Sequence, residues 1–180
     1  MTPQHVTLNT ERLELREPAE ADAPALLAYH VRNRDRIARW DPPRGDDVAQ
    51  HAAWIAWRLA ESRAGRARSW LAFDPAVPGV IAGEVQLDAI APRHSAMLAY
   101  SIDDAYEGKG YAREAVEAVI GYAFGELGLL SLSATYDPAN ERSGALLRRV
   151  GFVEMARTAA IPGFERHMRA QVLMMLARAS

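Results

Sequence analysis

The sequence contains no cysteine, which excludes disulfide bonds, thiolate metal ligands and a cysteine nucleophile. This absence suits a reducing compartment. No apolar run approaches the roughly 20 residues that a membrane-spanning helix needs. The segment Met1 to Asn9 also lacks the basic stretch followed by an apolar one that marks a secretory signal. We therefore predict a cytoplasmic protein with no membrane partner.

An excess of charge of either sign is also missing. The chain has 21 Lys and Arg against 23 Asp and Glu, a formal net charge of -2. Such a balance gives no general attraction for nucleic acid, so we predict no nucleic-acid partner, and any bound anion must be held by a local site. The five histidines show neither H-x-x-x-H spacing nor a cluster with aspartate, so we predict no metal.

The N-terminal third of the chain reads as one strand followed by helices. With 180 residues and 49% hydrophobic side chains, the sequence predicts a single domain over residues 1–180. Alternating polar and apolar residues predict a strand at Arg12–Arg16, and the patterns of Ala21–Val31 and Val48–Ala60 predict helices. The arginine-rich segment Arg32–Arg44 between them predicts a short helix and a loop.

From residue 69 onward the pattern changes to strands interrupted by two helices. Trp70–Phe73, Val80–Leu87 and Met97–Ile102 predict an antiparallel meander. After Gly110, small and apolar residues recur at helical spacing and predict the strongest helix of the chain. The remaining elements are predicted as a strand at Ser131–Tyr136, a helix from Asn140 through Val150, and strands at Val153–Thr158 and Arg169–Ala177.

The segment Glu107–Ala112 carries the clearest chemical signal, because it leads from a strand through a glycine turn into the strongest helix. Gly108 and Gly110 allow backbone angles that point successive N–H groups into one concavity, and the helix start adds unpaired donors and a positive dipole end. Lys109 adds a charge or points to solvent. Such a turn is suited to a phosphate or diphosphate. The alternative is that the glycines only make a tight turn.

Two familiar phosphate motifs do not fit this turn. No glycine is followed, after a four-residue gap, by Gly-Lys and then Ser or Thr, as a nucleotide triphosphatase loop requires. The dinucleotide fingerprint needs a third glycine where Arg113 stands, and the antiparallel strands upstream disfavour that fold further.

Three segments together resemble the GNAT superfamily, and within it the RimJ/RimL-like N-acetyltransferases. The family's acetyl-CoA motif is Q/R-x-x-G-x-G/A after a strand, and the turn matches it at Gly110 and Ala112 but departs from it at Glu107. We expect Glu107 to turn outward, because a carboxylate facing a diphosphate is unfavourable. The segment from Asn140 to Phe152 resembles the family's second motif, and Thr10–Arg16 resembles its first strand.

The resemblance implies an α+β fold with a mixed, mostly antiparallel sheet of about seven strands, splayed at the cofactor site and flanked by helices. It also implies that the pantetheine arm of the cofactor adds to the strand ending at Ile102 as if it were another strand. The implied cofactor-binding residues are Ile102, Gly108, Lys109, Gly110, Tyr111, Ala112, Asn140 and Ser143. Asn140 is alternatively a helix N-cap, and Ser143 an ordinary first-turn residue.

The implied reaction is direct acetyl transfer, which needs a neutral amine, a polarised thioester carbonyl and a protonated leaving thiolate. A strand N–H near Ile102 would polarise the carbonyl, and Ser143 is the candidate proton donor. The candidates for handling the amine proton are Glu84, a water held by Tyr100, and His94. Their alternatives are that Glu84 and His94 are solvated and that Tyr100 belongs to the core.

The leading prediction is an N-acetyltransferase that moves acetyl from acetyl-CoA to a primary amine, either a protein N-terminus or a small molecule. Glu107 and Met97, which stand where relatives carry other residues, motivate the alternative of a catalytically silent acyl-CoA-binding module. A third possibility is a phosphate-ester or nucleotide-binding domain unrelated to CoA. We expect a monomer or a homodimer.

Overall fold

A central sheet organises the protein. The computed structural model describes residues 6–42, 44–160 and 169–179, and within them one eight-stranded sheet has the order β1-β2-β3-β4-β5-β6-β8-β7. The strands are β1 (Thr7–Asn9), β2 (Glu14–Arg16), β3 (Arg68–Phe73), β4 (Ile81–Ala91), β5 (Ser95–Ile102), β6 (Ser131–Tyr136), β7 (Val153–Thr158) and β8 (Gln171–Ala177). About seven strands were predicted, and β1 is the one that the sequence pattern did not indicate.

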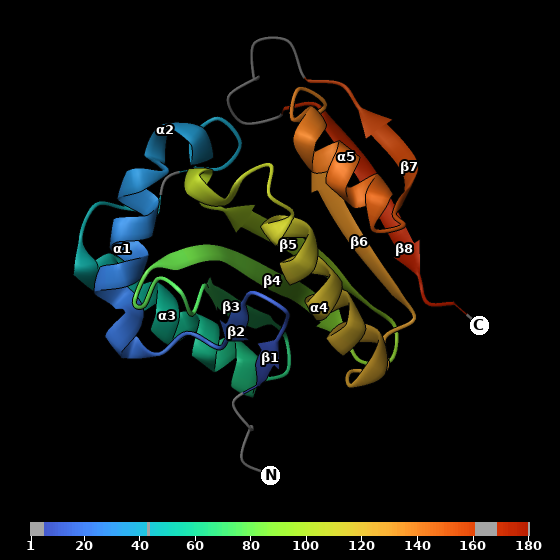
Figure 1. The fold of residues 1–180 in the computed structure, drawn as a ribbon. Helices are drawn as coiled ribbons and strands as arrows, with labels where there is room; N and C mark the ends of the chain where they lie inside the picture. Colours follow the sequence, from blue (N-terminus) through green and yellow to red (C-terminus); the bar gives the residue numbers. More distant parts are fainter. Residues whose placement is uncertain (1–5, 43, 161–168, 180) are drawn as a thin grey trace.

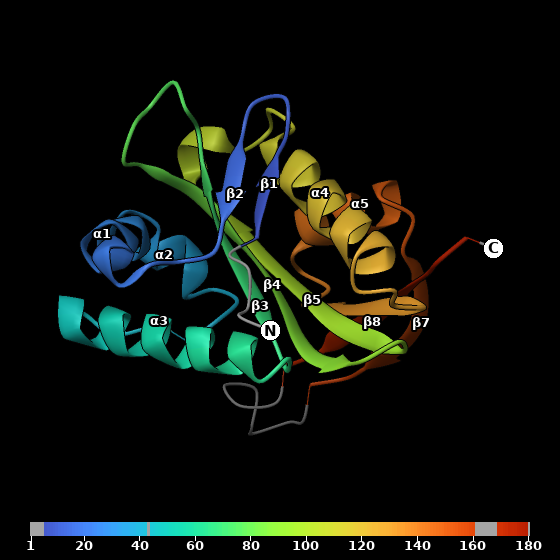
Figure 2. The same cartoon turned by 90° about the horizontal axis from the view of Figure 1, so that it is seen from below.

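Helices cover both faces of the sheet. They are α1 (Ala23–Arg32), α2 (Arg34–Ile37), α3 (Val48–Arg63), α4 (Tyr111–Gly125) and α5 (Glu141–Arg149), with short 3-10 helices η1 (Glu20–Asp22) and η2 (Asp104–Tyr106). The first three lie on one side, and α4 and α5 lie on the other (Figure 1, Figure 2). No helix in the described part of the chain is long and apolar enough to cross a membrane.

Strand alternation divides the core into two clusters. Val85 and Leu87 of β4 point toward α4 and pack in the larger cluster with Val116 and Val119. The smaller cluster has the buried members Ala23, Leu26, Tyr29, Ile55, Leu71 and Ile81. On β3, Leu71 packs in this cluster while its neighbours Trp70 and Ala72 pack in the larger one, because successive side chains of a strand point to opposite faces. The sheet therefore serves both clusters.

The sheet is mostly antiparallel and opens between two central strands. Strands β3 to β5 form the predicted antiparallel meander, β2 pairs antiparallel with β3, and β6, β8 and β7 pair antiparallel as well. Strands β5 and β6 are parallel and, though both lie wholly within the described residues, pair only over Ser95–Met97 and Ser131–Ser133. Beyond Met97 the two strands diverge, a region called the splay below. The predicted α+β fold with a splayed mixed sheet is confirmed.

Candidate active site

The splay leaves the second half of β5 with a free edge. Residues Leu98–Ile102 pair with β4 on one side, where Gly83 lies opposite Ile102, but have no register partner on β6. Backbone donors and acceptors at such an edge need a partner from elsewhere. The edge can therefore accept an extended ligand as an added strand.

The glycine turn, defined as Glu107–Ala112, follows this edge directly. Gly108 and Gly110 adopt φ angles of 70° and 87°, in the left-handed region that favours glycine. Gly110 is the N-cap of α4, and the first intrahelical bond runs from Glu114 N to Gly110 O at 3.1 Å. The N–H groups of Tyr111 and Ala112 precede that bond and are open to a ligand. The turn therefore has the backbone geometry of an anion site.

The lysine of the turn lies back against the protein. Lys109 Nζ donates to Ala105 O at 2.8 Å. In this arrangement the ammonium caps η2, so the backbone carries the anion-binding character of the turn.

The N-terminal strands brace the turn from outside. Arg12 donates from Nη1 to Lys109 O at 3.0 Å and from Nε to Glu114 Oε2 at 2.7 Å. Its guanidinium also lies 4.1 Å from the centre of the Tyr111 ring, a cation–π contact. Thr10 donates to the other oxygen of Glu114. The segment Thr10–Arg16, which carried part of the resemblance but no predicted role, thus holds the start of α4.

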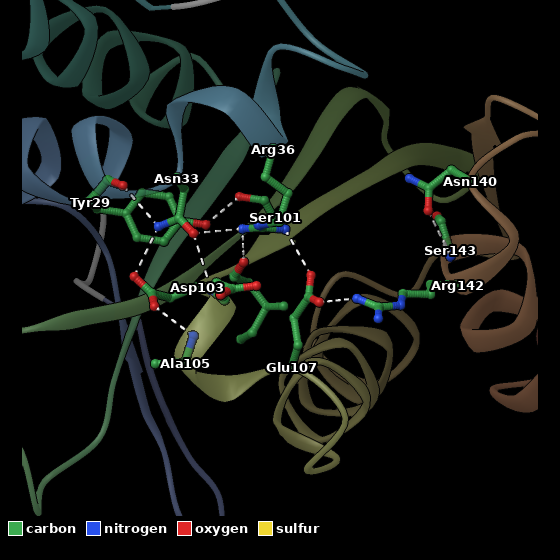
Figure 3. A network of polar contacts seen from close by, with 12 residues as sticks. Tyr29, Asn33, Arg36, Ser101, Asp103, Ala105, Glu107, Asn140, Arg142 and Ser143 are labelled. Atoms are coloured by element: carbon green, nitrogen blue, oxygen red, sulfur yellow. Dashed lines mark hydrogen bonds and ion pairs between the residues drawn. The ribbon is translucent and has the colours of Figure 1, made fainter.

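Glu107 does not turn outward as expected. Its side chain is 20% exposed and accepts from Arg36 Nη1 at 3.2 Å, while its second oxygen is paired with Arg142 (Figure 3). Two guanidinium groups compensate the carboxylate, which is why it can lie inward. They come from α2 and α5, so no local pattern indicated them.

Asn140, Ser143 and Tyr100 meet beside the splay. Asn140 Oδ1 accepts from Ser143 N at 3.2 Å, so Asn140 is the N-cap of α5. The hydroxyl oxygens of Tyr100 and Ser143 lie 2.9 Å apart. Because burial raises the pKa of Tyr100 to about 12, outweighing its hydrogen bond with Ser143, the Tyr100 hydroxyl stays protonated. The pair joins β5 to α5.

The position of α5 depends on a glycine contact with β6. A Cβ atom at Gly144 would lie 2.6 Å from the Tyr136 ring, closer than real side chains approach. Gly144 therefore lets the first turn of α5, with Asn140 and Ser143, lie close against β6.

Glu84 is buried within an ion-paired cluster. Its side chain lies 3.0 Å from His30 Nε2 and 2.8 Å from Arg44 Nη1, and the residue is only 3% exposed, so the solvated alternative is wrong. Burial alone would raise the pKa of Glu84, but Arg44 and His30 outweigh it and lower the pKa to about 2. A carboxylate with so low a pKa is a weak base toward an ammonium group.

Histidines missed by the sequence analysis complete this Glu84 cluster, defined as His30, Arg44, His51 and Glu84. His30 Nδ1 lies 2.9 Å from His51 Nε2, and His51 Nδ1 donates to Asp47 O at 2.9 Å. Burial lowers the pKa of His51. Arg44 stacks 3.8 Å above the Trp54 ring.

The sequence spacing of His30 and His51 could have shown that both lie on the buried faces of their helices. His30 lies four residues after buried Leu26, and His51 lies four residues before buried Ile55. In the described part of the chain, no group of three His, Cys, Asp or Glu side chains could hold a metal ion.

The Glu84 cluster lies next to the free edge of β5, on one face of the sheet. Glu84 is the register partner of Ser101, whose hydroxyl lies 2.7 Å from Tyr29 Oη. Glu84 and Ser101 therefore share the sheet face covered by α1 and α3. His94, the other base candidate, is exposed in the turn before β5, at the end of the strand opposite to Ile102.

These features agree with the sequence family. The profile of the acetyltransferase (GNAT) domain matches residues 12–153. The chain belongs to the GNAT acetyltransferase family. An alanine N-acetyltransferase of ribosomal protein uS5 from Escherichia coli is 33% identical over 153 residues, which cover 82% of this chain and 78% of the relative. The prediction of an N-acetyltransferase is confirmed, and a nucleotide-binding domain unrelated to CoA is set aside.

Solved structures show the same fold. The crystal structure of the ribosomal-protein-S5-alanine acetyltransferase of Vibrio fischeri has a TM-score of 0.86 with 25% identity and covers 96% of both chains. Mycobacterium smegmatis RimJ in complex with CoA-disulfide has a TM-score of 0.84 with 23% identity, covering 97% of this chain and 88% of that one. The second likeness concerns the fold alone.

Proposed function

We propose that this GNAT enzyme transfers acetyl from acetyl-CoA to the N-terminal amine of a protein. The observation that carries the proposal is the free edge of β5 running into a turn whose amides are open to an anion. An acyl-CoA matches both parts, since its pantetheine arm has peptide-like amides and its diphosphate is an anion. The Escherichia coli relative, an alanine N-acetyltransferase of ribosomal protein uS5, favours a protein acceptor.

In the proposed complex, the backbone holds the cofactor and two hydroxyls serve the leaving group. The diphosphate lies on the amides of the glycine turn, with Tyr111 and Ala112 as donors, and the arm follows β5 to Ile102. The amine attacks the carbonyl carbon, the C–S bond breaks, and the CoA thiolate takes the hydroxyl proton of Ser143. The proton that the attacking nitrogen loses returns to Ser143 Oγ, so the hydroxyl is restored. Tyr100, held 2.9 Å from Ser143 Oγ, supports that hydroxyl.

In the proposed mechanism, Glu84 is not the base that takes the proton from the amine. With a pKa of about 2, Glu84 acts as a fixed negative charge on the face covered by α1 and α3. The amine enters neutral, and positioning next to the thioester supplies much of the rate. A cytoplasmic location and a monomeric or homodimeric state stay predictions.

The test is acetyl transfer with purified protein and a panel of amines. Peptides beginning with alanine, serine or methionine, matched peptides blocked at the N-terminus but carrying lysine, and small amines are incubated with acetyl-CoA. Release of free CoA and the mass gain of one acetyl group on the unblocked peptides are expected. Turnover only with small amines would overturn the protein acceptor. Binding of acetyl-CoA without turnover of any amine would favour the silent module.

A further inference from the structure

An ion-paired bridge spans the splay beside the glycine turn. It consists of Arg36 from α2, Glu107 from the turn and Arg142 from the first turn of α5, and we call it the arginine bridge. Glu107 Oε1 lies 3.2 Å from Arg36 Nη1, and Glu107 Oε2 is paired with Arg142 Nη1 (Figure 3). Because α2 belongs to the half of the molecule before the splay and α5 packs on β6, the bridge joins the two sides.

Arg36 also uses the backbone group at which the free edge of β5 ends. Its Nη2 atom donates to Ile102 O and to Asn33 Oδ1, the latter at 3.0 Å. In the proposed acyl-CoA complex, Ile102 lies at the end of the edge that takes the pantetheine arm. Arg36 therefore occupies a backbone acceptor at the end of the ligand's path.

The hydrogen-bonding capacity of the bridge is not fully used within the described residues. Arg36 Nε is buried and has no hydrogen-bond partner among the described residues, an arrangement that costs free energy. One carboxylate serves two guanidinium groups, and Arg142 is 82% exposed, so its ion pair contributes little stability. A diphosphate offers more negative charge and more acceptor oxygens than this single carboxylate.

Glu107 stands where an anion would lie. It directly precedes Gly108 in the turn, and its carboxylate is held by two guanidinium groups, side chains that are suited to phosphate. We propose that Glu107 is an internal stand-in for the cofactor's diphosphate, holding Arg36 and Arg142 until acyl-CoA binds and takes Arg142 from it. The inference rests on the proposed acyl-CoA site and adds a competing carboxylate to it.

The proposal predicts an effect opposite to that of a simple structural tie. If Glu107 competes with the diphosphate, its neutralisation strengthens cofactor binding, because a like charge disappears and a guanidinium becomes available. If Glu107 only braces the two sides, its neutralisation loosens the site and weakens binding. The sign of the change therefore separates the two roles.

The experiment is calorimetric titration of the full chain at about 0.15 M salt with CoA and with dephospho-CoA, which keeps the diphosphate but lacks the 3′-phosphate. Glu107→Gln should bind both ligands about fivefold to tenfold more tightly than the wild type, the size expected for removing one like charge near the site. Arg142→Ala should bind both about fivefold to tenfold more weakly. In the double variant the gain from Glu107→Gln should shrink, because both changes act on one contact.

Matched controls alter neighbouring charges outside the bridge. Glu141→Gln removes an exposed carboxylate beside Arg142, and Arg149→Ala removes an exposed guanidinium at the end of the same helix. Both should change the dissociation constant by less than about twofold, since exposed charges away from the contact are screened. Thermal unfolding checks that every variant is folded.

Several results would overturn the proposal. Equal or weaker binding of both ligands by folded Glu107→Gln would show a tie rather than a competitor, and Arg142→Ala with wild-type affinity would do the same. A gain seen with CoA but not with dephospho-CoA would remove the diphosphate assignment. Failure of the wild type to bind either ligand would instead defeat the proposed cofactor site, so the two failures are distinguishable.

Discussion

The glycine turn offers backbone N–H groups at an exposed surface, whereas the Glu84 cluster holds side-chain charges beneath α1 and α3. In the turn, Gly108 and Gly110 are exposed, and their function depends on φ angles that other residues rarely adopt. In the cluster, Glu84 and His51 are buried, and each charge depends on its partners. The turn should therefore be sensitive to backbone change, and the cluster to removal of a single partner.

Removing the carboxylate from the buried cluster should have the largest effect on stability. Glu84→Ala leaves Arg44 and His30 facing a cavity without their common partner, and we expect a loss of about 3 kcal/mol in the free energy of unfolding. Urea unfolding at neutral pH measures it. Glu141→Ala, which removes an exposed carboxylate, should change it by less than about 0.5 kcal/mol. A loss below about 1 kcal/mol for Glu84→Ala would show that the cluster tolerates the removal of a charge nearly as well as an exposed position does.

Acid should remove the same contribution in the wild type. The folded pKa of Glu84, about 2, lies below the ordinary glutamate value of 4.5, so its ionisation contributes stability above pH 4.5 that is lost as the pH falls toward 2. The difference in unfolding free energy between wild type and Glu84→Gln should be constant above about pH 5.5 and shrink below 4.5. A difference that does not change down to pH 3 would contradict the buried ionised carboxylate.

The hydroxyl pair of Tyr100 and Ser143 should affect the chemical step rather than folding. Ser143→Ala removes the proposed proton donor to the leaving thiolate, and kcat should fall about 100-fold, the lower range for acid–base catalysis, with KM for acetyl-CoA nearly unchanged. Steady-state kinetics at several pH values measure this. Tyr100→Phe, which removes only the supporting hydroxyl, should cost less. A Ser143→Ala variant with wild-type kcat would assign Ser143 to the helix turn alone.

A methyl group in the glycine turn should lower stability less than the loss of the Glu84 carboxylate, and it should also weaken binding. Gly110→Ala places a Cβ atom at φ 87° and 3.3 Å from Arg12 Nη2, and should cost about 1–2 kcal/mol while weakening CoA binding. Gly121→Ala is the matched control, because its Cβ meets nothing within 4 Å in the interior of α4 and should stabilise by about 0.5–1 kcal/mol. Equal effects at both positions would mean that the turn's backbone angle is unimportant.

Much of the fold was predictable because its elements are long and periodic. The helix after Gly110, the meander and the final strands all lie within a few residues of their predicted positions. Strand β1 was missed because three residues paired only with β2 are too short to show a period. Strand β4 runs on to Ala91, past the predicted Leu87, because β5 continues to pair with it through an irregular register between Asp88 and Ala91.

The candidate site also has one part that the sequence predicted and another that it did not. The glycine turn was predictable because strand, glycines and helix are consecutive, so their geometry is set by local backbone preferences. The partners of Glu84 and Glu107 were not, because they come from helices and loops distant in sequence. His30 was seen only as one of five histidines without metal spacing, and Arg36 only as part of an arginine-rich segment.

The sequence alone determined where the backbone turns and that a helix starts at Gly110, since both depend on residues within one or two turns. Its motifs also showed which family the chain resembles. Only the tertiary structure decided which charges meet. The packing of α1, α3 and the Arg44 loop over β4 gives Glu84 its low pKa, and the approach of α2 and α5 lets Glu107 lie inward between two arginines. Electrostatic interactions act through space, and no local pattern records which distant side chains folding will bring together.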